Sequence, residues 1–253
     1  MPRALKSIVN EVINDSDVIL EVLDARMPNE TRNLNIERRI SIKRKTLIFV
    51  LNKCDLTNKD FLEKTKHELN KIAPCVFTST RYRYGITLLK KKLLRYKEAR
   101  VCVIGYPNTG KSSLINALRG KHSTRTSSIP GYTRSQQWIK LKQGILLIDT
   151  PGVIPMDQND ELKLALVNSK HPDRLKDPES VAIHILNILS KENPESLKET
   201  YGIELKDKPS LILIDIALKR KKLKKGGIPD IESTSKMIIL DWQTNKLRLI
   251  QSI

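Results

Sequence analysis

At 253 residues the chain is long enough for one large domain or two modest ones, each with a real core. Its 39% hydrophobic and 29% charged residues exclude a disordered chain, and no apolar run approaches the roughly 20 residues of a membrane span. The net charge of +18 favours a polyanionic partner, RNA or DNA, over the alternative of a basic surface kept only for solubility.

Residues 3–15 space their apolar positions as one face of a helix. Residues 18–24 then form an almost entirely apolar run, which is typical of a parallel strand covered on both faces. A loop at 25–29 and a charged helix at about 33–43 lead to a second run of this kind, residues 46–51. Buried strands that alternate with helices predict an α/β fold.

The second strand ends in Asn52-Lys53-Cys54-Asp55, a pattern that can recognise guanine. The Asp55 carboxylate can accept hydrogen bonds from both N1–H and the exocyclic amine of guanine, a donor pair that adenine lacks. Asn52 would hold the loop and contact the N7 side of the base, while the stem of Lys53 would lie over the base plane. Its place at the carboxyl end of a buried strand, where open α/β sheets bind ligands, strengthens the prediction.

A helix is predicted at about 58–72, followed by a third strand at 75–78 that ends in Ser79-Thr80. This short turn would offer a backbone N–H to the guanine O6 oxygen, a donation that the Thr80 side chain leaves possible. Residues 81–85 then form a basic, aromatic turn that could touch RNA or be a plain loop. An amphipathic helix with a strongly basic outer face is predicted at 86–97.

A glycine-rich loop follows the next apolar run, residues 101–104, and precedes a helical stretch at 114–118. Residues 105–112 match G-x-x-x-x-G-K-S, and strand, loop and helix in this order are the context of a phosphate-binding P-loop. Lys111 would reach the β- and γ-phosphates, and the Ser112 hydroxyl would ligate Mg²⁺. Backbone N–H groups at the start of a helix favour an anion there. We therefore predict nucleoside triphosphate contacts from Asn108, Thr109, Gly110, Lys111, Ser112 and Ser113.

Residues 121–135 are polar, basic and poor in periodic apolar positions, which favours a mobile loop. Within it, Thr133 stands where a second Mg²⁺ ligand would come from, although it could equally be a surface threonine. A predicted β-hairpin at 136–148 delivers Asp149-Thr150-Pro151-Gly152. Asp149 would hold Mg²⁺ through water and the Gly152 N–H would bind the γ-phosphate, so this loop would sense hydrolysis.

These motifs occur in an unusual order, because N-K-x-D and Ser79-Thr80 precede the P-loop while Thr133 and D-x-P-G follow it. Ordinary Ras-like GTPases run from the P-loop through the threonine and D-x-x-G to N-K-x-D. The chain therefore resembles the circularly permuted GTPases of the YlqF type, which assist assembly of the large ribosomal subunit. Residues 17–29, D-V-I-L-E-V-L-D-A-R-M-P-N, also look like the N-terminal signature of that family. The resemblance covers nearly the whole chain and implies a Ras-like sheet of about six strands.

The resemblance also implies a monovalent cation. Asn108 sits where potassium-dependent relatives place an asparagine that coordinates K⁺ beside the phosphates, in place of the charge of an arginine finger. Val153 follows D-x-P-G at the place where Ras-like enzymes carry a water-positioning glutamine. Because an apolar side chain cannot orient a water, we predict slow intrinsic turnover, with catalytic contacts from Lys111, Thr133 and Gly152.

After Gly152 the character of the sequence changes. A linker at 153–160 precedes helices predicted at 161–169, 178–191, 194–201, 209–225 and 231–245, several of which begin at a proline. The fourth of these helices ends in a basic run of Lys219, Arg220, Lys221, Lys222, Lys224 and Lys225. We predict that this run binds rRNA phosphates, the alternative being a solvated helix end. With aromatics at only 4%, phosphate and shape recognition is favoured over stacking on bases.

The sequence thus predicts a circularly permuted Ras-like P-loop GTPase domain at 1–155 and a smaller all-α, basic, RNA-binding domain at 156–253. GTP, GDP, Mg²⁺ and K⁺ are the expected ligands and the large-subunit rRNA is the expected partner, with nucleotide state controlling RNA affinity. The alternatives are a P-loop ATPase or kinase, an RNA-binding module that holds GTP without turnover, and a GTPase of the small subunit or of tRNA.

The cysteines Cys54, Cys75 and Cys102 are scattered and lack the spacing of a metal site, so we expect small apolar residues in a reducing compartment. No signal peptide is visible at Met1 and no membrane span is expected. The chain is predicted to be a cytoplasmic monomer.

Overall fold

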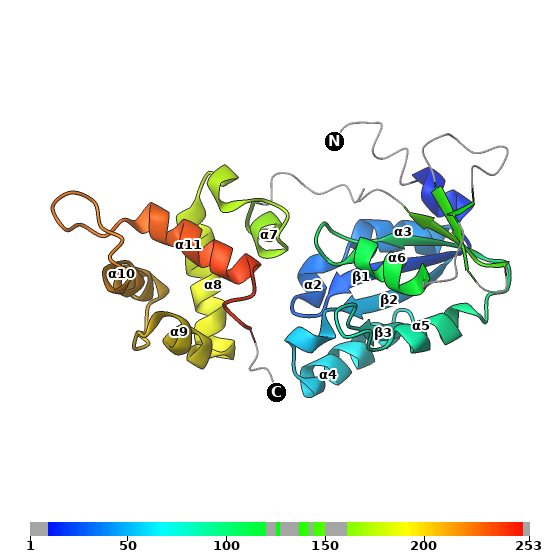
Figure 1. The fold of residues 1–253 in the computed structure, drawn as a ribbon, viewed down its shortest axis with the longest axis horizontal. Helices are drawn as coiled ribbons and strands as arrows, with labels where there is room; N and C mark the ends of the chain where they lie inside the picture. The colour runs from blue at the N-terminus through cyan, green and yellow to red at the C-terminus, as the bar shows by residue number, and fades with distance from the viewer. Residues whose placement is uncertain (1–9, 120–124, 127–136, 142–143, 150–160, 250–253) are drawn as a thin grey trace. The chain divides into compact units, whose positions relative to one another are not determined.

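The computed structural model describes residues 10–119, 125–126, 137–141, 144–149 and 161–249. The chain divides into two compact units (Figure 1). The first is formed by Met1–Asp55 and Lys59–Asp157, and the second by Leu56–Asn58 and Gln158–Ile253. The domain boundary predicted between residues 155 and 156 lies outside the described residues and stays a prediction.

The first unit is built around one mixed sheet whose strand order is β3-β2-β1-β4-β7-β6-β5. The first five strands in this order, β3, β2, β1, β4 and β7, run parallel to one another. Strand β6 pairs antiparallel with both β7 and β5. Strand β1 is central, with Val18 opposite Thr46 on one side and Val101 on the other. The bounds are β1 Val18–Asp24, β2 Thr46–Asn52, β3 Cys75–Thr78, β4 Arg100–Ile104, β5 Arg125–Thr126, β6 Gln137–Lys140 and β7 Leu146–Asp149.

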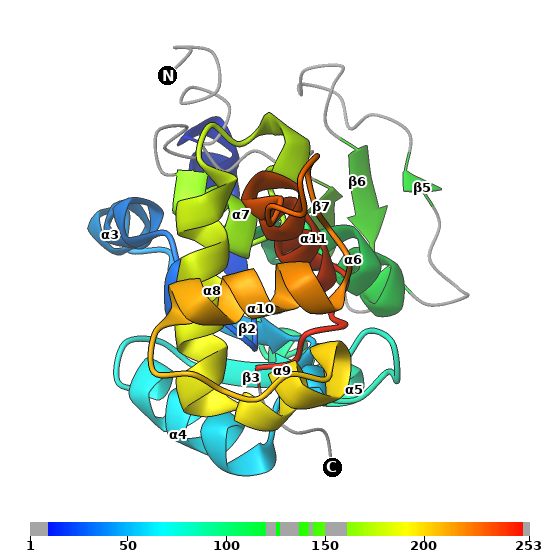
Figure 2. The ribbon, with the colours of Figure 1, turned by 90° about the vertical axis from the view of Figure 1, so that its left-hand side faces the viewer.

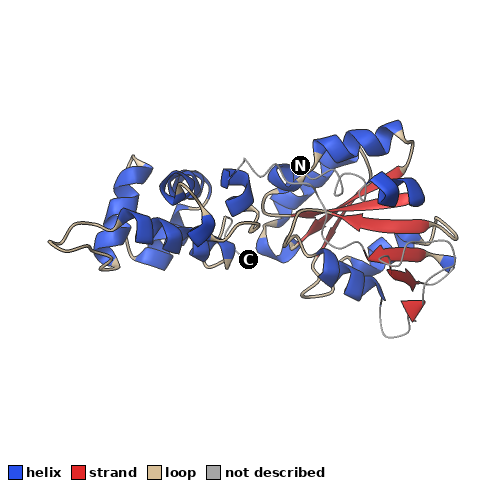
Figure 3. Cartoon of the chain, turned by 90° about the horizontal axis from the view of Figure 1, so that it is seen from above, coloured by secondary structure: helices blue, strands red, loops and turns tan. Residues whose placement is uncertain are grey.

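Helices cover both faces of this sheet, as Figure 3 shows. They are α2 (Pro28–Thr31), α3 (Leu34–Ile42), α4 (Lys59–Asn70), α5 (Ile86–Leu93) and α6 (Lys111–Arg119), with a 3-10 turn at Cys54–Leu56. All seven residues of β1 are buried, which accounts for its apolar sequence. Helix α2 was predicted as loop, and α5 ends at Leu93, four residues before the predicted Lys97.

The two faces of the sheet form separate apolar clusters, because side chains alternate along each strand. Val18, Leu20 and Val22 of β1 pack with residues of α5 and α6. Leu23 lies in the other cluster, with residues of β2 and α4. Glu21, in the middle of β1, is fully buried, and its Oε1 accepts a hydrogen bond from the Asn33 N–H at the start of α3, 2.9 Å away. A strand that reads as apolar thus carries one carboxylate aimed at a helix N-terminus.

The second unit is a bundle of helices. Its helices are α7 (Glu161–Leu166), α8 (Pro178–Glu192), α9 (Pro194–Tyr201), α10 (Pro209–Lys219) and α11 (Ile231–Gln243), with a 3-10 turn at Pro172–Arg174. Helix α8 packs against α9, α10 and α11 (Figure 2). The core includes Ile185, Ile212, Ile238 and Trp242, and the Trp242 Nε1–H donates to the Leu166 carbonyl at 3.1 Å. None of the helices in the described part of the chain could cross a membrane.

The basic run was predicted to lie in a helix at 209–225, and this prediction is wrong. Helix α10 ends at Lys219, and Lys221 takes a left-handed conformation with φ 54°. The chain then forms a tight loop in which Leu223 bridges Pro229, turned by Gly226 and Gly227 at φ 86° and 78°. Two consecutive glycines with positive φ explain the turn, since L-residues avoid that region. The loop projects beyond α10 and α11 (Figure 1).

Candidate nucleotide-binding site

The strand order brings the guanine-recognition pattern and the P-loop to one edge of the sheet. Asn52 ends β2 and Gly105 follows β4, and both strands pair parallel with β1 between them. Carboxyl ends of parallel strands lie at the same edge, where open α/β sheets bind ligands. The strand that carries N-K-x-D therefore precedes the P-loop strand in the chain yet lies two places from it in the sheet. This is the arrangement of a circularly permuted Ras-like sheet.

The P-loop conformation depends on its two glycines. Gly105 has φ 152°, and a Cβ there would lie 2.4 Å from the Val22 carbonyl oxygen. Gly110 has φ 94°, and its Cβ would lie 2.2 Å from the Asn52 side-chain nitrogen. Both contacts are closer than real Cβ atoms come to other heavy atoms. The glycines are needed here for backbone conformation and for close approach.

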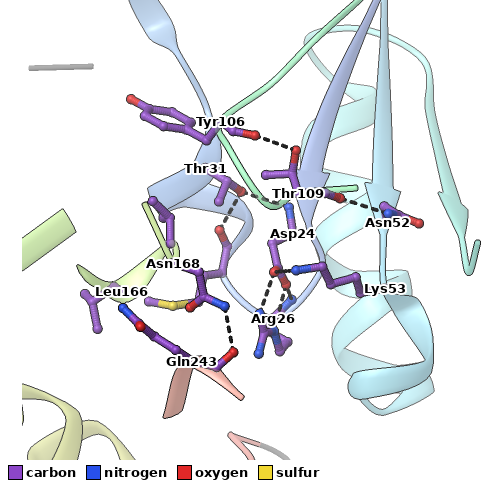
Figure 4. Close-up of polar contacts among 12 residues, drawn as sticks. Asp24, Arg26, Thr31, Asn52, Lys53, Tyr106, Thr109, Leu166, Asn168 and Gln243 are labelled. Atoms are coloured by element: carbon purple, nitrogen blue, oxygen red, sulfur yellow. Dashed lines mark hydrogen bonds and ion pairs between the residues drawn. The ribbon is translucent and has the colours of Figure 1, made fainter. Parts of the chain in front are cut away.

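Asn52 joins the guanine-recognition loop to the P-loop. Its side chain is fully buried, and its Nδ2–H donates to the Thr109 carbonyl at 2.8 Å. Its Oδ1 accepts from the Thr78 hydroxyl at 3.2 Å (Figure 4 shows Asn52 and Thr109). The predicted role of holding the loop is therefore visible in the contacts, and contact with guanine N7 stays a prediction. Losing a buried partner of this kind costs about 1–3 kcal/mol of stability.

Lys111 begins α6 and is largely buried. Its ammonium donates to the Tyr106 carbonyl at 2.6 Å, and the Thr109 hydroxyl donates to the same oxygen at 2.9 Å (Figure 4 shows Tyr106 and Thr109). Burial lowers the pKa of the Lys111 ammonium from 10.5 to about 8. The following Ser112 and Ser113 are exposed. A buried cation beside the backbone turn of the P-loop is suited to an anionic ligand.

Asp24 and Arg26 form part of this site, a role that sequence reasoning missed. Asp24 ends β1, and its carboxylate lies 2.8 Å from the Lys53 ammonium and 2.7 Å from the Arg26 guanidinium, which also donates through Nε at 2.9 Å (Figure 4). Burial alone would raise the pKa of the Asp24 carboxyl, but the bonds and charge of Arg26, with those of Lys53, outweigh it and lower the pKa to about 2. The signal available was position, since Asp24 and Asn52 end neighbouring strands in register.

The remaining predicted guanine contacts also lie at this edge. Asp55 lies in the 3-10 turn after β2 and is half-buried. Ser79 follows β3, and its own N–H already donates to the Tyr84 carbonyl at 3.1 Å, while its hydroxyl accepts from the Tyr82 N–H at 3.2 Å. Ser79 therefore shapes the turn rather than offering its N–H to a ligand. The half-buried Thr80 is left as the N–H donor predicted for guanine O6.

Several predicted residues lie outside the described ranges, namely Thr133, Thr150, Pro151, Gly152 and Val153. Asp149 is the last residue of β7, a strand that pairs parallel with the P-loop strand β4. Ser112 and Asp149 carry the oxygen atoms that Mg²⁺ prefers, so their chemistry fits this ion, and their role as its ligands stays a prediction. Within the described ranges, no three His, Cys, Asp or Glu residues gather as a protein-only metal site.

In the loop after α10, two of the six basic residues predicted to bind RNA also make contacts within the protein. The Arg220 guanidinium donates to the Thr200 carbonyl and lies over the Tyr201 ring at 5.4 Å. The Lys222 ammonium donates to the Ser233 hydroxyl at 2.9 Å. These two side chains therefore contribute to folding as well as to surface charge. The other four, Lys219, Lys221, Lys224 and Lys225, are exposed.

The three cysteines lie outside any disulfide and are buried. Burial raises the pKa of the Cys54 thiol to about 11 and those of Cys75 and Cys102 to about 12. All three thiols therefore stay protonated at neutral pH and act as small apolar side chains.

Comparison with known proteins agrees with this geometry. The model of the family described as 50S ribosome-binding GTPase matches residues 100–217. A GTP-binding protein of Methanocaldococcus jannaschii is 40% identical over 249 residues, which are 96% of this chain and 66% of that protein. Nuclear/nucleolar GTPase 2 of Oryza sativa is 34% identical over 94% of this chain and 46% of its own length. Nucleolar GTP-binding protein 2 of Neurospora crassa is 37% identical over 96% of this chain and 41% of its length.

Two solved structures match nearly the whole fold. GDP-bound YlqF of T. maritima covers 99% of this chain and 98% of its own, with a TM-score of 0.69 and 28% identity. The GNP-bound form of YlqF gives a TM-score of 0.66 at 27% identity. The chain spans about two thirds of the length of the archaeal relative and less than half that of the rice and Neurospora proteins.

Proposed function

Because the chain belongs to the family of circularly permuted GTPases that includes YlqF, we propose that it binds GTP, hydrolyses it to GDP and phosphate, and acts in assembly of the large ribosomal subunit. The observation that carries this proposal is the hydrogen bond from Asn52 to the Thr109 carbonyl, which couples a guanine-recognition loop directly to a P-loop. A P-loop ATPase or kinase would have no need for the guanine-recognition residues Asn52 and Asp55 at this edge of the sheet.

We assign the nucleotide contacts as follows. Asp55 accepts from the guanine N1–H and amine, the Thr80 N–H donates to O6, and the stem of Lys53 covers the base, with Asp24 holding its ammonium. In the P-loop, the ammonium of Lys111 pairs with the β- and γ-phosphates, and the N–H groups from Asn108 to Ser113 cradle them. Ser112 and Asp149, with Thr133, would hold Mg²⁺, which neutralises phosphate charge when bound.

We propose that hydrolysis is slow and K⁺-dependent. Asn108 is exposed at the phosphate end of the loop and takes a left-handed conformation with φ 60°, which asparagine tolerates better than most residues. A K⁺ ion held by its side chain would supply positive charge beside the phosphates. The test is phosphate release from GTP and from ATP by the full chain, in KCl and in NaCl. We expect phosphate release from GTP but not from ATP, and a higher kcat for GTP in KCl than in NaCl. Equal kcat in both salts would contradict the K⁺ assignment.

We propose that rRNA is bound by the loop after α10, through the exposed Lys219, Lys221, Lys224 and Lys225. The description of the matched family names the 50S ribosome, and two relatives are named nucleolar or nuclear/nucleolar GTP-binding proteins, which supports a ribosomal partner. The cytoplasmic location and the monomeric state stay predictions.

Cosedimentation with separated ribosomal subunits tests the partner. We expect the full chain to sediment with the large subunit, and K221Q/K224Q/K225Q to sediment less while binding GDP normally. Sedimentation with the small subunit but not with the large one would favour the alternative of a GTPase that acts on the small subunit.

We further propose that Thr133 and Gly152 link nucleotide state to RNA affinity. Equal sedimentation with GDP and with a non-hydrolysable GTP analogue would contradict that link.

A further inference from the structure

The turn that follows β3 carries two exposed tyrosines. Tyr82 is 66% exposed and Tyr84 is 58% exposed, and no other aromatic side chain whose exposure the structure describes is exposed to this extent. Arg81 and Arg83 alternate with them and are also exposed. Large aromatic side chains are costly to leave in water, yet two of them are exposed in this one turn of a chain that has only 4% aromatic residues.

The turn is held in a defined conformation rather than left open. The Tyr84 carbonyl and the Ser79 N–H form a β-bridge at 3.1 Å, and the Ser79 hydroxyl accepts from the Tyr82 N–H. The Tyr84 ring stacks on Phe77 of β3 with its centroid 6.0 Å away and an interplanar angle of 4°. Gly85 then takes φ 72°, where a Cβ would lie 2.2 Å from the Phe77 carbonyl oxygen. The exposed rings are therefore presented by a rigid support.

The sequence on both sides of the turn is basic. Residues 69–97 contain no Asp or Glu, and they contain eight cationic side chains, Lys71, Arg81, Arg83, Lys90, Lys91, Lys92, Arg95 and Lys97. Three of these lie on α5, the helix that follows the turn (Figure 1). The Arg81 guanidinium lies over the Tyr82 ring at 5.4 Å. A positive field with planar aromatic and guanidinium faces inside it matches an anionic polymer that also carries flat rings.

We infer that the turn formed by Arg81, Tyr82, Arg83 and Tyr84, with α5 behind it, binds RNA through unpaired bases. A base stacks on Tyr82, and the neighbouring arginines and the α5 lysines contact the flanking phosphates. Composition favours phosphate and shape recognition over base stacking, whereas the two strongly exposed tyrosines that the structure describes lie in a single turn. The inference rests on the proposed function for its partner class, and it adds a second contact surface in the first unit.

Base stacking separates this inference from simple charge attraction. A duplex has phosphates but keeps its bases stacked on each other, and an acidic polypeptide has negative charge but no flat rings. A contact made through Tyr82 therefore predicts a preference for single strands that disappears when the ring is removed. Tyr82 is the residue to change, because Tyr84 packs on β3 and its loss would disturb the guanine edge.

The test measures fluorescence anisotropy of a labelled single-stranded RNA of about 12 nucleotides, and of a duplex of the same length, with the full GDP-bound chain at fixed salt. To remove the other basic loop, all variants are made in the K221Q/K224Q/K225Q background. We expect Tyr82→Ala to raise the Kd for the single strand roughly 5- to 150-fold and to leave the duplex Kd unchanged. Tyr82→Phe keeps the ring and should stay close to the background value.

Ile42→Ala is the matched control, because Ile42 is a 74% exposed apolar residue elsewhere in the first unit. The inference is overturned if Tyr82→Ala binds the single strand as the background does, or loses single strand and duplex by the same factor. It is also overturned if a poly-glutamate peptide competes with the single strand and depends equally on Tyr82, since the partner is then an acidic protein. If the wild-type chain binds no RNA but binds GDP, the rRNA part of the proposed function fails as well; if only the Tyr82 effect is missing, this inference fails alone.

Discussion

At the scale of single residues, Asp24 is the centre of a group of charged contacts at the sheet edge that carries the guanine-recognition loop. Its carboxylate is almost completely buried and contacts two cations, Arg26 and Lys53. A buried charge of this kind is stable only while its partners remain, and removing one partner strands the others in a poorly solvated environment. Asp24 therefore links the stability of the fold to the placement of the Lys53 side chain.

We expect Asp24→Asn to lower the free energy of unfolding at pH 7 by about 2–4 kcal/mol, because the buried Arg26 would lose the carboxylate that it is hydrogen-bonded to. The folded pKa near 2 lies below the ordinary value of 3.8, so the carboxylate stabilises the fold above about pH 4 and loses this effect as the pH falls from 4 towards 2. The pH-dependent part of the stability that follows from this lowered pKa is about 2 kcal/mol.

Urea unfolding at pH 7 and at decreasing pH measures this change. Glu63→Gln is the control, since Glu63 pairs with Lys66 on the surface, where such pairs contribute about 0–1 kcal/mol. The stability difference between wild type and Asp24→Asn should shrink below pH 4. An Asp24→Asn protein as stable as Glu63→Gln would show that the buried cluster contributes nothing.

Lys111 gives a second prediction at this scale. Because burial lowers its pKa to about 8, part of the population is neutral at pH 8 to 9, and a bound phosphate would restore the charged form. We expect GDP binding to take up protons at pH 8.5 and GDP affinity to fall as the pH rises through 8. Calorimetry in two buffers of different ionisation enthalpy measures the uptake; Lys111→Arg, always charged, should lack this component. Uptake of the same size in Lys111→Arg would assign it to another group.

At the scale of elements, two glycines with similar backbone conformations differ in what surrounds them. Gly110 in the P-loop has φ 94° and a Cβ position 2.2 Å from the Asn52 side chain, whereas Gly226 in the basic loop has φ 86° and nothing within 4 Å. The comparison separates the cost of a left-handed residue from the cost of a clash. The former alone is roughly 1–2 kcal/mol.

We expect Gly226→Ala to lower the free energy of unfolding by about 1–2 kcal/mol and to leave GDP binding unchanged. Gly110→Ala carries the same backbone cost and must also displace Asn52, so it should lose more stability and weaken GDP binding by more than about tenfold. Unfolding curves and fluorescent GDP titrations of both variants make the comparison. Equal GDP affinity in the two would mean that Gly110 is not needed for close approach.

Element boundaries show where sequence reasoning failed. The helix predicted to reach Lys225 ends at Lys219. The predicted end was too late because lysine, arginine and leucine favour helix and the visible stop signal, Gly226-Gly227, comes several residues after the true end. The left-handed Lys221 that turns the chain has no sequence signature. The buried strands, in contrast, were predictable because their apolar runs have no other satisfactory environment.

At the scale of the whole molecule, the sheet order explains why the nucleotide motifs could be recognised from the sequence while their partners could not. The P-loop and N-K-x-D are local patterns that remain readable when their order in the chain is permuted. The Asp24 contacts with Lys53, and the Asn52 contact with Thr109, depend on β2, β1 and β4 lying side by side, which no local pattern reveals. The exposed tyrosines of the β3–α5 turn likewise became informative only once their exposure was known.

Guanine selectivity supplied from β2 is the central claim for this molecule, and a swap of nucleotide preference tests it most directly. Affinities of the wild type and of Asp55→Asn are measured for GDP, ADP and xanthosine diphosphate. The wild type should bind GDP far more tightly than ADP, and Asp55→Asn should lose GDP affinity and gain affinity for xanthosine diphosphate, whose ring presents a carbonyl where guanine presents an amine. Comparable binding of ADP and GDP by the wild type, or an unchanged preference in Asp55→Asn, would contradict the account.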